Sequence, residues 1–288
     1  MKLILSRKGF DSSAGKVASP ILADGRMFSL PIPSKHAATR YQDITLCGCS
    51  LGDVVPELTS GRIRADGRTH LDPDLVASAL PSRRSGWRGL FGQAGGAQTI
   101  LAREGVGAGD VFLFFGWFRR AERRAGALRF AKGASNLHVL FAWLQIERVL
   151  DVASIPSAEL PAWAHDHPHV RNNQHLTRNT LYVAAERLAL DGVDTGLPGA
   201  GVFQRYDERL RLTKPDASRS LWSLPAWFEP QPRSKRPPLG CHADPTRWRR
   251  AGDRVELRSV ARGQEFVLDA DRYPEAVPWI RETVAIGR

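Results

Sequence analysis

Cysteine is scarce in this chain of 288 residues. Three cysteines are present, Cys47, Cys49 and Cys241, and no two of them form a CxxC pair. Three residues cannot build a disulfide framework, so the composition excludes a small disulfide-stapled secreted domain and favours a reducing cytoplasm. We interpret Cys47 and Cys49 as structural, because no matching metal ligands accompany them.

Long apolar runs are missing as well. The opening segment MKLILSRKGF has too few apolar residues for a signal peptide, and no stretch approaches the roughly 18 apolar residues that a membrane span needs. The sequence also lacks a P-loop, a GxGxxG fingerprint and zinc-finger spacing. We therefore expect a soluble cytoplasmic protein with no membrane partner.

Acidic residues are outnumbered by basic ones. The chain has 41 Lys and Arg against 30 Asp and Glu, a net charge of +11, and most of the excess lies in the first 150 residues. Such an excess is typical of proteins that bind a polyanion, although an arginine-rich and alanine-rich composition also follows from a GC-rich genome. We expect DNA phosphates to be contacted by arginines of two basic loops, namely Arg83, Arg84, Arg88, Arg123 and Arg124.

Two strongly apolar segments predict the centre of the fold. Val111–Phe118 and Leu137–Val149 are strand candidates, and Lys2–Ser6 alternates as a first strand. We expect a strand-rich α+β single domain, with a mixed α/β arrangement as the alternative. A basic, proline-rich connector suggests a core over residues 1–231 and an accessory segment over 232–288, packed on that core.

Helix signals are few. The segment DPDLVASAL at 72–80 predicts a short helix, with Asp72 as its N-cap and Pro73 in its first position. Two further helices are expected over Ala97–Glu104 and near Ala276–Val284. An N-cap role explains Asp72 structurally. Asp72 also belongs to a group of titratable side chains, His70, Asp72 and Asp74, which is the functional alternative.

Segments spread in order over nearly the whole chain carry a family resemblance. They are LSRKGFDSSAGKVASPIL near the start, HLDPDL at 70–75, FGQ at 91–93, GVGAGDVFLFFGWFR at 105–119, HVLFAWLQ at 138–145, HPHV at 167–170, NTLYVA at 179–184 and LPAWF at 224–228. The chain resembles the third nucleotide-modification-associated domain family of bacteria and phages, which gene neighbourhood links to systems that make or handle modified DNA bases. The resemblance implies DNA or a nucleotide as partner, beside the other enzymes of such a system.

Residues 105–150 are also similar to part of another fold. GDVFLFF, a loop and HVLFAWLQIERV resemble the returning strands of PUA-like barrels of the ASCH and EVE group, which hold a base or nucleotide beside such strands. A generic buried hairpin is the alternative. We keep a PUA-like β-barrel over 105–150 as one arrangement that the fold can contain.

The exit of the first strand is rich in side chains that bind ligands. Arg7 and Lys8 offer positive charges for a phosphate, Ser12 and Ser13 offer hydroxyls, and Asp11 offers a general base. The structural alternative is a solvated turn with an Asp–Arg pair. We predict that Asp11 is catalytic and that the other four bind phosphate or nucleotide.

Three histidines alternate in the segment AHDHPHV: His165, His167 and His169. In an extended chain they would share one face, near enough for Zn²⁺ or Fe²⁺ completed by Asp166 or His175. The spacing matches no established zinc pattern, so we expect no tight metal and keep the three histidines as an alternative metal site. The family resemblance covers His167 and His169, which we predict to be catalytic acid–base groups.

The two apolar strands offer groups that can hold a base. Gln145 can read a base edge through two hydrogen bonds, and Arg119 can bind the nucleotide beside aromatic side chains that stack. The favoured function is a base- or nucleotide-modifying transferase or hydrolase. A non-catalytic reader of modified bases and an RNA-binding or structural accessory protein are the alternatives, and the sequence indicates no particular cofactor.

Overall fold

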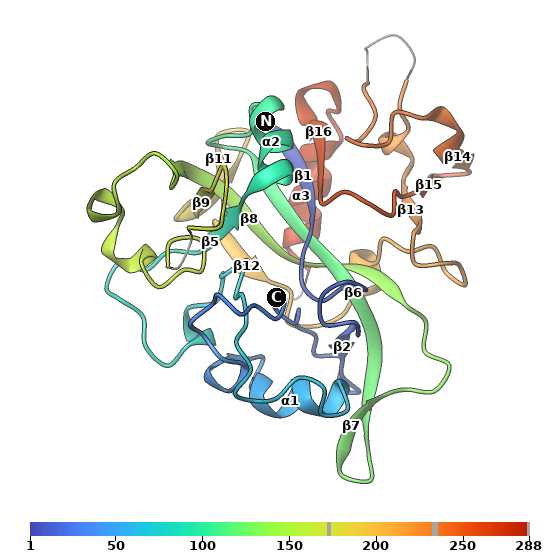
Figure 1. The fold of residues 1–288 in the computed structure, drawn as a ribbon. Helices are drawn as coiled ribbons and strands as arrows, with labels where there is room; N and C mark the ends of the chain where they lie inside the picture. Colours follow the sequence, from blue (N-terminus) through green and yellow to red (C-terminus); the bar gives the residue numbers. More distant parts are fainter. Residues whose placement is uncertain (172–173, 232–235, 287–288) are drawn as a thin grey trace.

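The computed structural model describes residues 1–171, 174–231 and 236–286. Nine strands form a mixed sheet at its centre (Figure 1). Its main path runs in the order β16 (Glu265–Asp269), β1 (Lys2–Arg7), β6 (Val111–Arg124), β8 (Leu137–Asp151), β9 (Thr180–Ala184) and β5 (Leu90–Gln93). Three short strands pair along its longest members: β2 (Ser19–Ile21) and β7 (Ala127–Phe130) with β6, and β12 (Ala200–Val202) with β8.

Smaller elements surround this sheet. A three-stranded sheet has the order β13 (Leu221–Pro225), β15 (Arg254–Arg258) and β14 (Trp248–Ala251), and two hairpins are formed by β3 (Thr45–Leu46) with β4 (Cys49–Ser50) and by β10 (Arg187–Leu190) with β11 (Val193–Pro198). The α-helices of the described residues are α1 (Leu51–Leu58), α2 (Gly95–Arg103) and α3 (Ala276–Val284). None of these helices is long and apolar enough to cross a membrane.

The predicted strand-rich α+β class is confirmed. The two apolar segments of the sequence lie in β6 and β8, which pair antiparallel, while β1 runs parallel to β6. The barrel over 105–150 needs correction, because the described strands form open sheets rather than a closed barrel. On the side away from β6, β8 pairs with β9 and β12, so these strands extend a larger sheet instead of closing a small one.

The two ends of the open sheet nevertheless approach each other. No backbone ladder joins the end strands β5 and β16 among the described residues. Their side chains meet instead, because Nε2 of Gln93 on β5 donates a hydrogen bond of 2.5 Å to Oε1 of Glu265 on β16. The ring of Phe91 on β5 lies 5.0 Å from the rings of both Phe112 and Phe114 on β6. The sheet therefore coils around an aromatic core and leaves a seam between β5 and β16.

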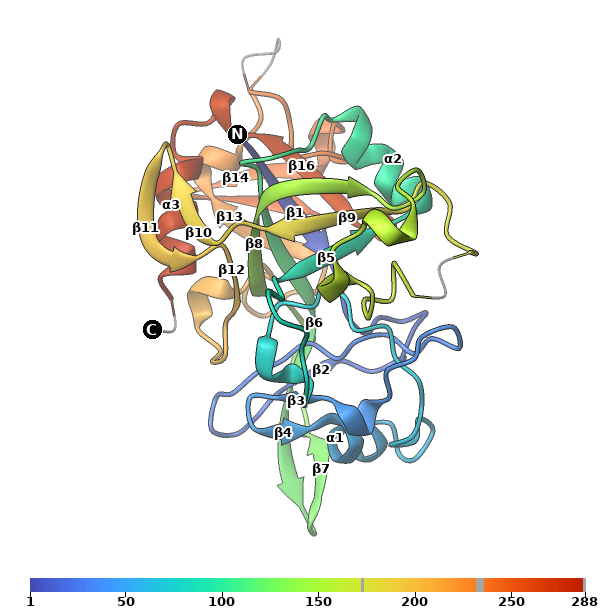
Figure 2. The same ribbon diagram turned by 90° about the vertical axis from the view of Figure 1, so that its left-hand side faces the viewer.

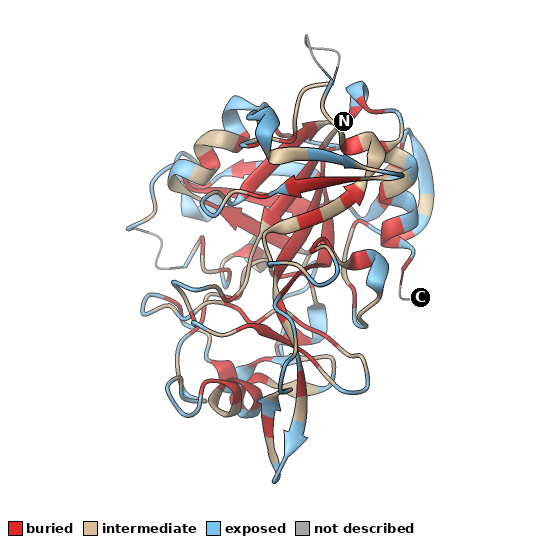
Figure 3. Cartoon of the chain, turned by 90° about the vertical axis from the view of Figure 1, so that its right-hand side faces the viewer, coloured by how far each residue is buried: buried red, intermediate tan, exposed pale blue. Residues whose placement is uncertain are grey.

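The central strands are buried on both faces (Figure 3). Leu3, Ile4 and Leu5 on β1 are all inaccessible to solvent, as are residues 111–115 on β6. Strands covered on both faces read as continuous apolar runs rather than as alternating patterns. This explains why β6 and β8 carry the strongest apolar signals in the sequence.

Two smaller clusters support the surrounding loops. One gathers around α1 and includes Phe10, Tyr41 and Leu128; the part of the chain with α1 and β7 lies below the main sheet in Figure 2. The other joins Leu90 and Leu181 of the sheet to Leu160 and Ala164. This second cluster anchors the loop that precedes β9 and carries the alternating histidines.

The predicted helix over 72–80 is wrong. Only Ala77–Ala79 form a single 3-10 turn, and Asp74 instead exchanges two backbone hydrogen bonds of 2.8 Å with Leu90 of β5. Local capping preference is weak compared with pairing to a buried strand, so tertiary context prevails here. The helices expected over 97–104 and 276–284 are confirmed as α2 and α3.

The segment after the connector joins the central sheet. β16 pairs antiparallel with β1, with Leu268 opposite Leu3. The division into a core over 1–231 and an accessory segment over 232–288 stays a prediction. Residues 232–235 of the connector lie outside the described residues.

Candidate functional site

Three histidines converge on one buried carboxylate beside β5. The Nε2 atoms of His70, His167 and His169 lie 3.9, 3.4 and 3.8 Å from the nearest carboxylate oxygen of Asp72. The side chain of Asp72 is 6 % exposed, and that of His70, at 20 %, is the most accessible of the four. We call these four residues the Asp72 cluster.

β5 positions two members of the cluster. The backbone N–H of Gly92 donates a hydrogen bond of 2.7 Å to Oδ1 of Asp72. A Cβ atom on Gly92 would lie 2.2 Å from Cδ2 of His169, so the ring packs directly on the strand where a side chain is missing. The FGQ segment thus holds Asp72 and His169 in one place.

Asn179 fixes the tautomer of His169. Nδ2 of Asn179 donates to the carbonyl oxygen of His169 over 2.6 Å, so Oδ1 of the same amide faces the ring. This oxygen lies 2.6 Å from Nδ1 of His169 and can only accept, which places the ring proton on Nδ1. Nε2 of His169 therefore presents a lone pair toward Asp72.

Burial sets the charge state of the cluster. It lowers the pKa of both His70 and His169 to about 4, against the opposing attraction of the Asp72 carboxylate. Burial also disfavours the ionised form of Asp72, but the close contact with His167, whose Nε2 lies 3.4 Å from Oδ1, and the attraction of the other two imidazoles outweigh it and lower the pKa of that carboxyl. Among the described ion pairs, those of Asp72 involve imidazoles and no Lys or Arg. Near neutral pH Asp72 is therefore ionised, while His70 and His169 are neutral.

A second buried carboxylate adjoins the cluster at the seam. Oε1 of Glu265, which is fully buried, accepts hydrogen bonds from Ser6 Oγ at 3.1 Å, Lys8 Nζ at 2.9 Å and Gln93 Nε2 at 2.5 Å. Its Oε2 has no hydrogen-bond partner among the described residues. Gln93 follows Gly92 on β5, and the charge of Lys8 contributes to the lowered pKa of His70. We call the Asp72 cluster, Gln93, Lys8 and Glu265 together the polar centre, because β5 connects them and the charge of Lys8 acts on His70 as well as on Glu265.

This centre combines groups that can move protons or bind a cation. One ligand atom each from His70, Asp72 and His169 can be chosen so that all three lie within 4.8 Å of one another. Neutral imidazole nitrogens and a carboxylate are donors that divalent transition metals take in proteins. Buried groups of this kind, with pKa values moved from their usual ranges, are characteristic of functional sites.

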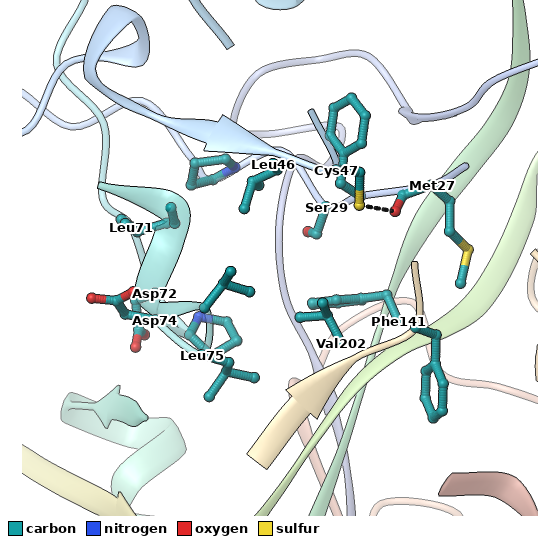
Figure 4. A pocket seen from close by; sticks show the side chains of 16 residues that line it. Met27, Ser29, Leu46, Cys47, Leu71, Asp72, Asp74, Leu75, Phe141 and Val202 are labelled. Carbon is teal, nitrogen blue, oxygen red and sulfur yellow. Dashed lines mark hydrogen bonds between the residues drawn. The ribbon is translucent and has the colours of Figure 1, made fainter. Parts of the chain in front are cut away.

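Two hollows border the segment that carries Asp72. The first has an empty volume of about 560 Å³, open solvent included, and apolar side chains such as Leu75, Phe141 and Val202 face it (Figure 4). Asp72 lies at its edge with the carboxylate turned away from it (Figure 4). The second hollow is polar and is lined by Trp87, Trp163, Arg83, Arg84 and Arg171, among others.

A family model described as nucleotide modification associated domain 3 matches residues 2–269, nearly the whole chain. The chain belongs to this family. Its name points to a role in nucleotide or DNA modification. The match spans both the Asp72 cluster and Glu265. No curated protein and no solved structure matched the chain.

Three of the predicted site residues of this nucleotide modification associated domain 3 protein lie in the polar centre: Lys8, His167 and His169. The histidine segment is not extended, however, because a 3-10 turn over Ala162–Ala164 and further turns shape it. The extended conformation, on which a shared face for the three alternating histidines depends, is therefore not found. Nε2 of His165 lies 3.3 Å from a backbone carbonyl oxygen, that of Leu160.

The other predicted residues near the first strand make local contacts. Asp11 accepts hydrogen bonds of 2.6 and 2.7 Å from two backbone amides of its own turn, and Ser12 and Ser13 are exposed. Arg7 donates to two carbonyls of residues 260–261. The catalytic role of Asp11 and the phosphate-binding roles of the other three stay predictions.

The two residues expected to hold a base are tied to backbone. The buried side-chain amide of Gln145 forms two hydrogen bonds with the backbone of Ala189. Nε2 donates to the carbonyl oxygen over 2.6 Å, and Oε1 accepts from the backbone nitrogen over 2.8 Å. Arg119 donates to the carbonyl of Ala131 and lies over the ring of Phe130. These contacts connect β8 to β10 of the neighbouring hairpin and β6 to the residue that follows β7. The nucleotide-binding roles stay predictions.

The five arginines predicted to contact DNA are each paired with a carboxylate. The pairs are Arg83 with Asp74, Arg84 with Asp166, Arg88 with Glu147, Arg123 with Glu57 and Arg124 with Glu122. Arg84, Arg123 and Arg124 stay more than half exposed, whereas Arg83 is 14 % exposed. Arg123 and Arg124 end β6, which with β7 forms the projecting hairpin in Figure 2. DNA contact by these residues stays a prediction.

Sequence reasoning missed several residues of the polar centre. Gln93 and Asn179 lie in the FGQ and NTLYVA segments that carry the family resemblance, so a signal was present for both. His70 and Asp72 lie in HLDPDL, where the N-cap interpretation competed with a functional one. Glu265 stands in no segment that suggests a site.

Proposed function

We propose that this protein is an enzyme that modifies a base in DNA or in a nucleotide precursor, by group transfer or hydrolysis, at the Asp72 cluster. One observation carries the proposal: the Asp72 carboxylate is buried among imidazoles and has no Lys or Arg partner in the described residues. Removing a charge from water costs several kcal/mol, and the groups that offset this cost around Asp72 are imidazoles rather than a permanently charged side chain. Buried titratable groups with shifted pKa values are typical of a site kept for chemistry.

The surroundings of the cluster suit an anionic substrate. His70 is the most accessible member and marks the side from which a substrate reaches Asp72. Lys8 holds a positive charge close by, fixed by Glu265 and by the face of Phe91, whose ring centroid is 4.5 Å from Nζ. A fixed cation beside a buried acid–base centre stabilises a phosphate or a developing negative charge.

A non-catalytic reader of modified bases is the second candidate function. The polar hollow favours it, because Trp87 and Trp163 offer aromatic faces and Arg84 and Arg171 offer charges for a phosphate. Arg83 connects this hollow to the cluster, since its guanidinium binds Asp74, two residues from Asp72, through two contacts of 2.6 Å. A base bound in the hollow would thus lie beside the segment that carries the cluster.

Turnover distinguishes the two functions. Wild-type protein, His70→Ala and the control His165→Ala are incubated with DNA and with nucleotide pools, modified and unmodified, and the digested nucleosides are compared by mass spectrometry. For an enzyme, wild type and His165→Ala alter a nucleoside, whereas His70→Ala loses on the order of 10²–10⁴ in rate. Binding without turnover, lost in Trp87→Ala, would identify a reader. Full turnover by His70→Ala would refute the Asp72 cluster as the reaction centre.

A further inference from the structure

The Asp72 cluster contains a contact that the protein's own atoms leave unsatisfied. Nε2 of His169 presents a lone pair, because the ring proton is on Nδ1, which donates a hydrogen bond to Oδ1 of Asn179. Oδ2 of Asp72 lies 3.8 Å from this nitrogen. That distance is too long for a hydrogen bond, and two acceptors that face each other repel unless a cation lies between them.

The two oxygens of Asp72 have different surroundings. Oδ1 accepts the N–H of Gly92 at 2.7 Å and faces Nε2 of His167 at 3.4 Å. Among the described ion pairs, those of Oδ2 are with imidazole nitrogens, of His70 at 3.9 Å and of His169 at 3.8 Å, neither within hydrogen-bond distance. Oδ2 is therefore held in place by the contacts of Oδ1 and left available to a ligand.

The spacing of the three available atoms fits one ion. Bonds of about 2.0–2.2 Å place two ligands of the same transition-metal ion roughly 3–4 Å apart. The distances from Asp72 Oδ2 to His70 and His169 lie in this range, and the ligand atoms of all three residues lie within 4.8 Å of one another. A second observation points the same way, because Nε2 of the buried His167 has no hydrogen-bond partner among the described residues.

We propose that His70, Asp72 and His169 bind one divalent first-row transition-metal ion, of the class of Fe²⁺, Mn²⁺ or Zn²⁺. Two neutral imidazoles and one carboxylate form a set that these ions use, with positions left open for water or substrate. Asn179 is the partner that orients the His169 ligand, as outer hydrogen bonds do in metal sites. The inference deepens the proposed function, on which its catalytic meaning rests.

The proposed set differs from the one that the sequence suggested. Sequence reasoning expects no tight metal and keeps His165, His167 and His169 as the alternative, whereas the geometry points to His70, Asp72 and His169. The exposed edge of His70 provides the path by which an ion enters. His165 turns to a backbone carbonyl and serves as a control from the same loop.

Metal binding is measured directly on the full chain without a histidine tag. The protein is stripped with a chelator and titrated with Co²⁺, whose absorption reports its ligands, and Zn²⁺ content is measured after dialysis. Wild type and His165→Ala should bind one ion per chain. His70→Ala and His169→Ala should lose most of the affinity, and Asn179→Ala should bind about 10–100-fold more weakly.

The outcomes separate this inference from the proposed function. A wild-type chain that takes up no ion, or a His70→Ala chain that binds it as wild type does, would overturn the site. Circular dichroism of the metal-free variants shows which are folded, and if His169→Ala unfolds, His70→Ala at the accessible edge decides. Stoichiometric binding without turnover would refute the enzyme and leave the metal site standing. Turnover by metal-free protein that binds no ion would refute the metal site alone.

Discussion

Gly92→Ala is the substitution that tests the placement of His169 most directly. The residue lies on β5, and its φ is not in the left-handed region, so alanine creates no backbone strain there. The three atoms nearest to an added Cβ all belong to the imidazole ring of His169. Any loss of stability in this variant therefore reports the contact between the ring and the strand.

The expected magnitude follows from the distances. The added Cβ would lie 2.2 Å from Cδ2 and 2.3 Å from Cγ of His169, whereas ordinary contact begins at 3.4 Å. The ring must move by roughly 1 Å, and overpacking of this kind costs about 1–3 kcal/mol. Loss of the hydrogen bond between His169 and Asn179 adds about 1 kcal/mol. We expect the free energy of unfolding to fall by about 2–4 kcal/mol.

Urea denaturation with a chelator present measures this loss without a contribution from metal binding. The control is Gly96→Ala in α2, where an added Cβ meets nothing within 4 Å and alanine favours the helix, so stability should stay equal or rise by up to about 1 kcal/mol. In a His169→Ala background the ring is absent, and Gly92→Ala should then cost little. An equal cost in both backgrounds would refute the packing of His169 on Gly92.

Acid should destabilise the fold, because His242 is buried with Nε2 accepting a backbone amide. Burial lowers its pKa from 6.5 to about 4, so the unfolded chain binds the extra proton between these values. His242 alone should contribute about 2 kcal/mol to the fall in unfolding free energy from pH 7 to pH 5, so the profile of His242→Gln should be flatter than that of wild type by this amount. Arg83→Ala should cost about 3–5 kcal/mol in urea denaturation, because the buried Asp74 loses its partner, and a cost below about 1 kcal/mol would contradict this. DNA affinity, measured by fluorescence anisotropy, should drop steeply as the salt concentration rises. The double variant Arg123→Ala, Arg124→Ala should weaken binding to all DNA sequences equally. An affinity that does not change with salt would contradict this.

The long elements were predictable because their signals are local. β6 and β8 are apolar over many consecutive residues, and α3 has helical periodicity that ends where the prediction ended. The order of strands in the sheet has no such signal, since β1 pairs with β16 across nearly the whole chain. The helix predicted over 72–80 is the opposite case. Its sequence contains a local capping signal, but Asp74 forms backbone hydrogen bonds with Leu90 of β5 instead.

The polar centre was predictable only in part, for a related reason. His167 and His169 stand out by residue type and by family resemblance, whereas Lys8 and its partner Glu265 are separated by 257 positions. No pattern in the sequence connects such distant residues. Asp72 was ambiguous in another way. Asp followed by Pro indicates a helix N-cap, but the same pair is also compatible with a buried aspartate in a functional site.

The seam of the sheet explains why these distant residues meet. β5 and β16 end the main strand path, and the contact between Gln93 and Glu265 links them without a backbone ladder. Polar side chains at such a seam can exchange partners with a bound molecule, which a closed ladder of backbone hydrogen bonds would not permit. Oε2 of Glu265, which has no hydrogen-bond partner among the described residues, lies at this seam, and the lone pair of His169 lies beside β5, facing Asp72. The seam thus holds buried polar groups with unused hydrogen-bonding capacity, which is what the proposed modification of a base would require.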